Sequence, residues 1–288
     1  MAEIIVNADD FGLSSGVNRG IVRAWKEGIL TSASLMPAGG AFEEAVELAR
    51  ENPGLQVGLH LTLVQGRGVL PPHEIPGLVD GDGNFTDNPV AAGMRYFFLK
   101  TLRPQLKKEI EAQILRVRRT GLPLTHLDGH LNIHMQPVVF DILAELMPKH
   151  GIKTFRLTRE DLAANLAFDR SRQTGKQVDA FIFSRLARRC RPVLERLVIA
   201  SAGEVRGLLN SGRMTEWYLL DTLRRLKKPL TEIYFHPGCL PCDEIRRWMP
   251  DYRHEEELAA LVSDRVKELL VADGITLRNY RGEIKRIC

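Results

Sequence analysis

The sequence lacks the features that mark membrane and secreted proteins. No run approaches the ~18 apolar residues that a membrane span needs. The first residues, MAEIIVNADDFG, carry three acids and no basic segment, which excludes a typical secretion signal. Four cysteines among 288 residues are too few for a disulfide scaffold. We therefore expect a cytoplasmic protein.

An excess of charge of either sign is also missing. Lys and Arg number 40 against 36 Asp and Glu, which leaves a formal net charge of +4. Aromatic residues make up only 7%, and no dense basic run is interleaved with them, so we expect no nucleic-acid partner. An Arg-rich stretch at 181–201 alternates apolar and basic residues. We interpret it as an amphipathic surface helix, with peripheral contact to the inner face of the membrane as the alternative.

The sequence does contain a repeated alternation of strand-like and helix-like segments. Residues 3–7 are β-branched and apolar, whereas 41–52 and 255–272 place apolar residues at helical spacing. Other strand-like segments follow at 31–37, 55–63, 124–134, 153–159 and 230–238. Repeated β-then-α units predict an α/β fold with parallel strands and outer helices, and a chain of this length is sufficient to close a barrel.

Two stretches interrupt the alternation. Residues 64–103 are rich in Gly, Pro and Asp and read as a long loop excursion, a feature that is often functional. Residues 160–213 are Arg-rich with helical pieces, and we interpret them as a possible helical insertion. Since neither stretch resembles a linker, we expect a single domain over 1–288.

Acids and histidines gather where predicted strands end. Asp9 and Asp10 follow the first strand, His60 ends VGLH, and His236 ends EIYFH. The stretch THLDGHLNIH adds a further set at or near period two, which places the first three on one strand face if the strand is regular: His126, Asp128, His130 and His134. Because the carboxyl ends of parallel strands meet at one rim, we expect these residues to converge there.

Such a group suits a divalent ion and hydrolysis. Two imidazoles and one carboxylate, with a position left for water, form a catalytic zinc pattern, and a second carboxylate can take the proton of the water. The adjacent carboxylates of Asp9 and Asp10 would then have separate roles, one as metal ligand and the other as base. In a regular strand the two side chains would point to opposite faces, so we predict a bend at the pair, with a turn at Gly12. The alternatives are a solvated turn and a hydrated histidine loop.

Four segments together resemble a known family. VNADDFGLSSGVNRGI, VGLHLTL, THLDGHLNIHM and YFHPG occur in the order found in the YdjC-like carbohydrate deacetylases. The resemblance implies a distorted, seven-stranded β/α-barrel that removes acetyl groups from N-acetylated sugars. It implies that Asp10, His60 and His126 are metal ligands and that Asp9 is the general base. His236 becomes the general acid, or a group that holds the leaving amine.

The same resemblance extends to the remaining polar residues of the motifs. They would orient the ligands or bind sugar hydroxyls: Asp128, His130 and His134. Outside the four motifs, Arg156 in TFRLTR is expected to reach the same pocket. For Arg156 a structural salt bridge is an equal alternative. The expected cofactor is one divalent ion, zinc, with magnesium as the alternative, and the family implies a homodimer.

One departure from the family pattern bears on the substrate. Members that act on chitooligosaccharides tend to have a further His where this chain has Asn132. The DGHLNIH form resembles the hopanoid-biosynthesis-associated branch (HpnK), which implies an N-acetylglucosaminyl hopanoid glycolipid as substrate and acetate as product. A chitooligosaccharide is the alternative substrate.

Other functions remain open from the sequence alone. A metal-dependent phosphoesterase would use two metals and more carboxylates, and a glycosidase would need two acids such as Asp9 and Asp128. Cys239 and Cys242 form a lone C-x-x-C, which is weak support for a redox role. A sugar- or metal-binding module without catalysis would have no need for Asp9 beside Asp10.

Overall fold

The architecture is an α/β fold around a curled sheet of parallel strands, as expected. A computed structural model describes residues 2–286. Its strands run in the order β4-β3-β2-β1-β6-β5, with β7 also paired to β1. The strands are β1 (Glu3–Phe11), β2 (Ser32–Leu35), β3 (Gln56–Leu61), β4 (Leu124–Gly129), β5 (Glu204–Arg206), β6 (Leu230–Phe235) and β7 (Thr276–Leu277).

Single bridges continue the sheet beyond β4. Leu127 pairs with Phe155, and Thr154 pairs with Ala200, shortly before β5. Val205 of β5 donates its N–H to the carbonyl of Arg159 at 3.1 Å. The pairing therefore passes from β4 through the segment around Phe155 to β5, which gives the sheet the curvature of a distorted barrel.

β1 lies at the centre of the sheet because its sequence suits burial on both faces. Ile4, Val6 and Ala8 are fully buried, and the strand pairs with β2, β6 and β7. Continuous apolar strands of this kind are typical of parallel sheets covered by helices. The acidic pair therefore lies at the end of the most enclosed strand.

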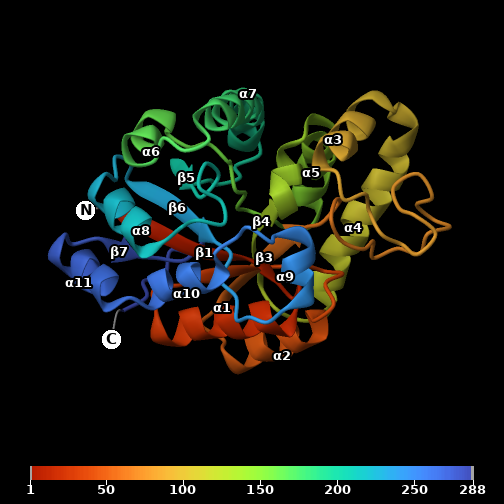
Figure 1. Cartoon of the computed structure of the whole chain (residues 1–288). Helices are drawn as coiled ribbons and strands as arrows, with labels where there is room; N and C mark the ends of the chain where they lie inside the picture. The colour runs from red at the N-terminus through yellow and green to blue at the C-terminus, as the bar shows by residue number, and fades with distance from the viewer. Residues whose placement is uncertain (1, 287–288) are drawn as a thin grey trace.

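Helices surround the sheet (Figure 1). α1 and α2 lie together below it, whereas α3, α4 and α5 lie on the opposite side from α6 and α8 (Figure 1). The helices are α1 (Ser15–Glu27), α2 (Phe42–Glu51), α3 (Pro89–Phe98), η1 (Lys100–Leu102), α4 (Arg103–Arg119), η2 (His130–Met135), α5 (Pro137–Lys149), α6 (Leu162–Phe168), α7 (Gln173–Arg196), α8 (Glu216–Arg224), α9 (Asp243–Trp248), α10 (His254–Val262) and α11 (Asp264–Ala272). Within residues 2–286, none of them is long and apolar enough to cross a membrane.

Several element boundaries differ from the expectation. The helix expected over 255–272 is divided at Ser263, which has φ −62° and ψ 128° and caps α11 by accepting a hydrogen bond from Val266 N. Serine is a favoured N-cap, so the apolar periodicity alone concealed a helix start. The strand expected over 153–159 is reduced to the bridges at Thr154 and Phe155.

The two irregular stretches contain more structure than their composition indicated. The excursion at 64–103 includes α3, which begins at Pro89 after the cap Asn88. The stretch at 160–213 is partly helical, through α6 and α7, but it also supplies β5 of the central sheet. A strand of three residues carries too little periodicity to be recognised in a sequence.

Candidate active site

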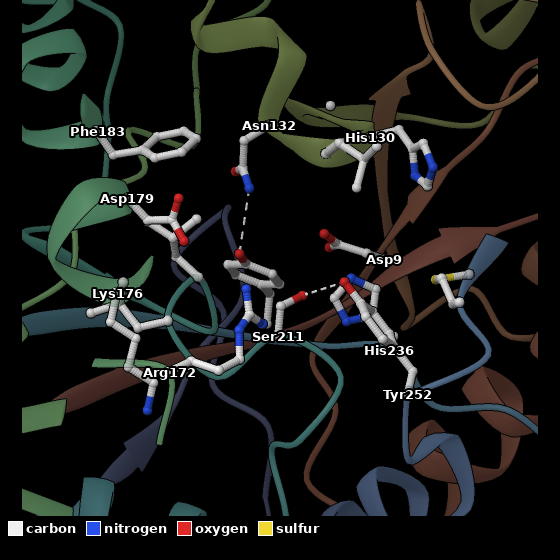
Figure 2. Close-up of a pocket in the computed structure, with 16 residues that line it drawn as sticks. Asp9, His130, Asn132, Arg172, Lys176, Asp179, Phe183, Ser211, His236 and Tyr252 are labelled. Carbon is white, nitrogen blue, oxygen red and sulfur yellow. Dashed lines mark hydrogen bonds between the residues drawn. The ribbon is translucent and has the colours of Figure 1, made fainter. Parts of the chain in front are cut away.

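A cavity of about 230 Å³ lies at the carboxyl ends of the strands. Asp9, His130, Asn132 and His236 line it, which brings together residues from β1, η2 and the segment after β6. Figure 2 shows these side chains around the open centre of the cavity. Convergent polar groups in such a cavity are typical of an active site.

The bend predicted at the acidic pair is confirmed. Asp10 has a positive φ of 66°, and the β1–β2 register shifts between Ala8 and Phe11. Gly12 follows with φ 90°, and Asn18 Oδ1 accepts a hydrogen bond from Gly12 N at 2.8 Å. A left-handed conformation costs a non-glycine residue about 1–3 kcal/mol and persists where the surrounding structure holds it, often at functional sites.

The bend places Asp10 against two histidines. Asp10 Oδ1 lies 2.8 Å from His130 Nδ1 and 3.2 Å from His60 Nε2. Each of the three residues offers a ligand atom, and these atoms lie within 4.8 Å of one another. Asp10 Oδ2 and His130 Nε2 are buried without a hydrogen-bond partner in the described structure. Unpaired buried donors and acceptors are costly, and a cation bound by the three residues would remove that cost.

The charges in this group act on one another strongly. Burial alone raises the pKa of Asp10, but the charges and hydrogen bonds of His130 and His60 outweigh burial and lower the pKa well below its usual value. Burial alone lowers the pKa of His60, but the charges of Asp128 and Asp9, with hydrogen bonds to Asp10 and Asp128, raise it to about 10. In the absence of a metal His60 is therefore protonated and positively charged near pH 7. A bound divalent cation would supply this positive charge in place of the proton.

Asp128 contacts the ring nitrogen of His60 that does not face Asp10. Its Oδ1 lies 2.8 Å from His60 Nδ1, which leaves His60 Nε2 directed toward Asp10. Ser34 Oγ donates to Asp128 Oδ2 at 2.6 Å. Carboxylates that hold the second nitrogen of a metal-ligating histidine are common in metal sites. Asp128 is therefore placed to orient His60.

Arg156 joins three acids at the base of the site. Its Nη1 and Nη2 donate to the two carboxylate oxygens of Asp9, each at 2.7 Å. Arg156 Nη2 also lies 2.7 Å from Asp128 Oδ2, and Arg156 Nε donates to Glu232. Burial alone lowers the pKa of Arg156, but the charges of Asp128, Asp9 and Glu232 raise it well above its usual value. Arg156 thus forms a buried ion network, and through Asp9 the network reaches the cavity.

This network also bears on the competing hydrolase functions. Asp9, His60 and Asp128 form a second group with ligand atoms within 4.8 Å. A cation there would have to displace Arg156, which already binds both carboxylates. The arrangement favours one metal over the two that a phosphoesterase often uses. Asp9 and Asp128 are tied to one guanidinium, which does not suit the opposed acids of a glycosidase.

The structure places His126 outside the group that the resemblance assigned to it. His126 Nε2 lies 3.0 Å from Ser34 Oγ, its Nδ1 lies 2.9 Å from Thr125 Oγ1, and its ring stacks on Tyr280 at 3.8 Å. Burial lowers the pKa of His126 to about 3. His130, and not His126, contacts Asp10. Residues two apart on a strand share a face but lie roughly 6.8 Å apart along it, and His126 precedes His130 by two such steps. Period two alone could therefore not decide which histidine reaches the rim.

His134 and His236 have different surroundings. His134 Nε2 lies 2.9 Å from the carbonyl oxygen of Arg156, and burial lowers the pKa of His134 to about 4. His236 lines the cavity, and burial lowers its pKa to about 4 despite the charges of Asp10 and Asp9. His134 therefore supports the Arg156 segment, whereas His236 faces the space where a substrate would bind.

Glu257 holds His236 in place, a role that no sequence motif indicated. Glu257 Oε2 accepts a hydrogen bond from His236 N at 2.6 Å, and Oε1 accepts one from Met214 N at 3.0 Å. Burial raises the pKa of Glu257 to about 7. Its position in the acidic first turn of α10 resembles an ordinary helix start, so the sequence carried no signal for this role.

Cys239 and Cys242 lie beside α1. The backbone N–H of Cys239 donates to the carbonyl of Gly16 at 3.0 Å, and Cys242 Sγ lies 2.9 Å from Ser14 Oγ. Neither cysteine is among the described residues that line the cavity. Their positions do not support a redox role in the chemistry of this cavity.

Comparison with known proteins identifies a family and several relatives. The family model described as YdjC-like protein matches residues 3–272. A carbohydrate deacetylase of Brevibacillus brevis is 40% identical over 150 residues, which are 52% of this chain and 57% of the relative. A carbohydrate deacetylase of Geobacillus stearothermophilus is 40% identical over 149 residues, or 51% of this chain and 57% of the relative. The matched stretches thus span little more than half of these curated relatives.

One solved structure shares the fold over nearly its full length. It is a candidate cellobiose-phosphate cleavage protein of Enterococcus faecalis V583, 26% identical, with a TM-score of 0.74. The likeness covers 97% of this chain and 98% of that one. The curled parallel sheet and its surrounding helices are therefore an established fold.

Proposed function

This chain belongs to the YdjC-like protein family, and from that premise we propose that it is a metal-dependent hydrolase that removes the acetyl group from an N-acetylated sugar. The observation that carries the proposal is the buried group of Asp10, His60 and His130 beside Asp9 at one cavity. The curated relatives named carbohydrate deacetylases support the reaction.

We assign the metal to Asp10, His60 and His130. One carboxylate and two imidazoles suit zinc better than magnesium, which prefers oxygen ligands, so zinc is the proposed ion and magnesium the alternative. A divalent ion bound there would supply Lewis acidity, which acidifies water and polarises the acetamide carbonyl. Asp128 keeps His60 oriented toward this position through its 2.8 Å contact with Nδ1.

Asp9 is the proposed general base. It lines the cavity, and Arg156 and the Nδ2 group of Asn7 fix its carboxylate, with Asn7 donating at 2.9 Å. Asp9 takes a proton from the attacking water as the new C–O bond forms. The C–N bond then breaks, and the proton passes to the departing nitrogen, which gives acetate and an amino sugar. Arg156 positions Asp9 for both steps.

His236 is proposed to contact the leaving nitrogen. Its pKa of about 4, lowered by burial, makes the imidazole neutral near pH 7. A neutral imidazole suits a hydrogen bond that orients the amide nitrogen better than it suits a strong acid. Glu257 supports this role because it fixes the backbone N–H of His236.

The substrate that we propose is an N-acetylglucosaminyl group on a hopanoid lipid. The argument rests on Asn132, which lines the cavity and accepts a hydrogen bond from Thr158 Oγ1 at 2.7 Å. A residue at this position contacts the space where the substrate binds, so the exchange of His for Asn affects substrate choice. A lipid-linked substrate also implies peripheral contact with an anionic membrane. A homodimer is part of the same proposal.

The direct test is acetate release. Purified protein with added zinc or magnesium is incubated with N-acetylglucosamine, a chitooligosaccharide and an N-acetylglucosaminyl glycolipid. We expect acetate from at least one substrate, abolished by a chelator and restored by the metal. Release of phosphate from phosphorylated sugars or cleavage of the glycosidic bond, without acetate, would contradict the proposal.

A further inference from the structure

Two adjoining cavities lie along a face of α7 that does not line the candidate active site. The larger has a volume of about 750 Å³ and the smaller about 300 Å³, and Arg159 and Ser184 line both. Residues of α7 line them at helical spacing, among them Gln177, Ala180, Phe181, Ser184, Arg188 and Arg191. Side chains at such intervals lie on one side of a helix. The two cavities therefore form one groove, which we call the α7 groove.

Three arginines gather at the smaller cavity of the α7 groove. Arg159, Arg188 and Arg191 line it together with Ser184. None of the three guanidinium groups forms an ion pair or a hydrogen bond with another residue that the structure describes. Glu195 is the single acid among the residues of 2–286 that line this cavity. Because guanidinium groups bind phosphate through paired hydrogen bonds, this end of the groove suits a phosphate group.

The larger cavity offers apolar surface. Leu166 of α6 lines it together with Ala180 and Phe181 of α7, and the two helices lie side by side (Figure 1). Phe181 is 62% exposed, and its neighbours Val178 and Ile182 are also exposed. Exposed apolar patches of this kind mark interaction sites, and the volume is within the range of small-molecule sites. This end of the groove suits an apolar chain.

The acids that line the larger cavity are already engaged. Asp161 Oδ2 lies 3.1 Å from Lys227 Nζ, and Glu204 Oε1 lies 3.0 Å from Arg206 Nη2. The buried Glu160 accepts hydrogen bonds at Oε2 from two backbone N–H groups that follow β5, at 3.2 and 3.0 Å. These acids therefore leave the positive charge of the arginine end uncompensated.

We propose that the α7 groove binds one anionic phospholipid of a membrane, with the phosphate at Arg159, Arg188 and Arg191 and an acyl chain along Phe181. Charge and apolar surface occupy different ends of the groove, as they do in such a lipid. A second copy of this chain fits less well, since an isologous contact would bury the unpaired arginines of both copies in one interface. The inference specifies the membrane contact that is part of the proposed function, but it requires no catalysis.

The first experiment measures flotation with vesicles. We expect the wild type to bind vesicles of phosphatidylcholine and phosphatidylglycerol in equal parts and not vesicles of phosphatidylcholine alone. One basic residue near an anionic membrane contributes about fivefold in affinity. Exchange of Arg159, Arg188 and Arg191 for Gln should therefore weaken binding about 100-fold. The double variant Arg188→Gln, Arg191→Gln, which keeps Arg159 beside β5, should weaken it about 25-fold.

A matched control removes the same charge elsewhere. Arg19, Arg119 and Arg281 are exposed and line neither cavity of the groove. Their combined exchange for Gln should leave binding to the mixed vesicles as in the wild type. An equal loss in both triple variants would assign binding to net charge and would overturn the site, as would a wild type that binds neither kind of vesicle.

The second experiment tests the acyl chain. In calorimetric titration we expect a short-chain phosphatidylglycerol to bind at least about tenfold more tightly than glycerol 3-phosphate, since each buried CH₂ adds affinity. Phe181→Ala should reduce this ratio, whereas Phe97→Ala, which truncates an exposed Phe on α3, should not. Equal affinities for the two ligands would indicate a site for free phosphate and would overturn the lipid proposal.

Two further outcomes separate this inference from its competitors. Tighter binding of polyglutamate than of the mixed vesicles would overturn the lipid in favour of an acidic protein partner. Failure of every sugar substrate to release acetate would overturn the deacetylase proposal alone. Lipid binding that is lost in the groove variants and kept in the controls would still support the α7 groove in that case.

Discussion

His130→Ala and His126→Ala form a matched pair that tests the metal site. Each substitution removes one buried histidine from the same motif, but only His130 contacts Asp10. Loss of a supporting partner commonly weakens metal binding 10–100-fold, so loss of one of three ligands should weaken it at least about 100-fold. At a zinc concentration of about 1,000 times the wild-type Kd, bound metal stabilises the fold by about 4.1 kcal/mol.

The expected change follows from these magnitudes. A 100-fold weaker Kd reduces the stabilisation in His130→Ala to about 1.4 kcal/mol, a loss of about 2.7 kcal/mol. For a domain of this size 1 kcal/mol corresponds to about 2 °C in Tm, so the zinc-induced rise in Tm should shrink by about 5 °C. The difference in Tm with and without zinc is compared between variants, so the stability that each substitution itself removes does not enter the result.

His126→Ala should keep the zinc-induced rise in Tm even though the protein is less stable. Calorimetric titration with zinc gives Kd for both variants and checks the thermal result. If His126→Ala loses the metal and His130→Ala retains it, the ligand set derived from the structure is wrong and the set implied by the family resemblance is correct.

Three further predictions concern the base, the pH dependence and the packing below the site. Asp9→Asn should lower kcat by about 10²–10⁴-fold while the zinc content stays at one ion, because the base is lost but the ligands remain; full activity would exclude Asp9 as the base. The folded pKa of His60 is about 10, above its unfolded value of 6.5. The stability it contributes to the metal-free protein is therefore complete below about pH 6.5 and is lost as pH rises through 10. Urea unfolding should show this fall in the wild type but not in His60→Gln, and equal slopes would refute it. Gly58→Ala should destabilise the fold by about 1–3 kcal/mol in urea unfolding, because the new Cβ would lie 2.4 Å from the ring of His126; an unchanged midpoint would contradict the packing described here.

The sequence alone predicts where the acids and histidines converge, because the carboxyl ends of parallel strands meet at one rim. The bend at Asp10 was also predictable, since two adjacent side chains in a regular strand cannot reach one site. The choice between His126 and His130 was not, because it depends on where β4 ends. The strand ends at Gly129 and η2 begins at His130, with Leu131 and Asn132 in left-handed conformations inside it.

The other features that no motif indicated are contacts between residues distant in sequence. Ser34 lies in a short strand that reads as core, yet its hydroxyl contacts both His126 and Asp128. Glu257, Asp179 and Phe183 lie outside every recognised motif. The folded chain brings Glu257 against the backbone of His236 and places Asp179 and Phe183 at the cavity. Local periodicity contains no information about such long-range contacts, which depend on how the elements pack.

Arg156 holds Asp9 within the central sheet, whereas part of the cavity wall lies on a helix outside the sheet. Acids on β1, β4 and β6 hold the guanidinium inside the sheet, so Asp9, the proposed base, is fixed by the central part of the fold. Asp179 and Phe183 line the cavity from α7, a helix outside the sheet. Under the proposed function, substitutions on α7 would therefore alter the surface that faces the substrate without moving Asp9.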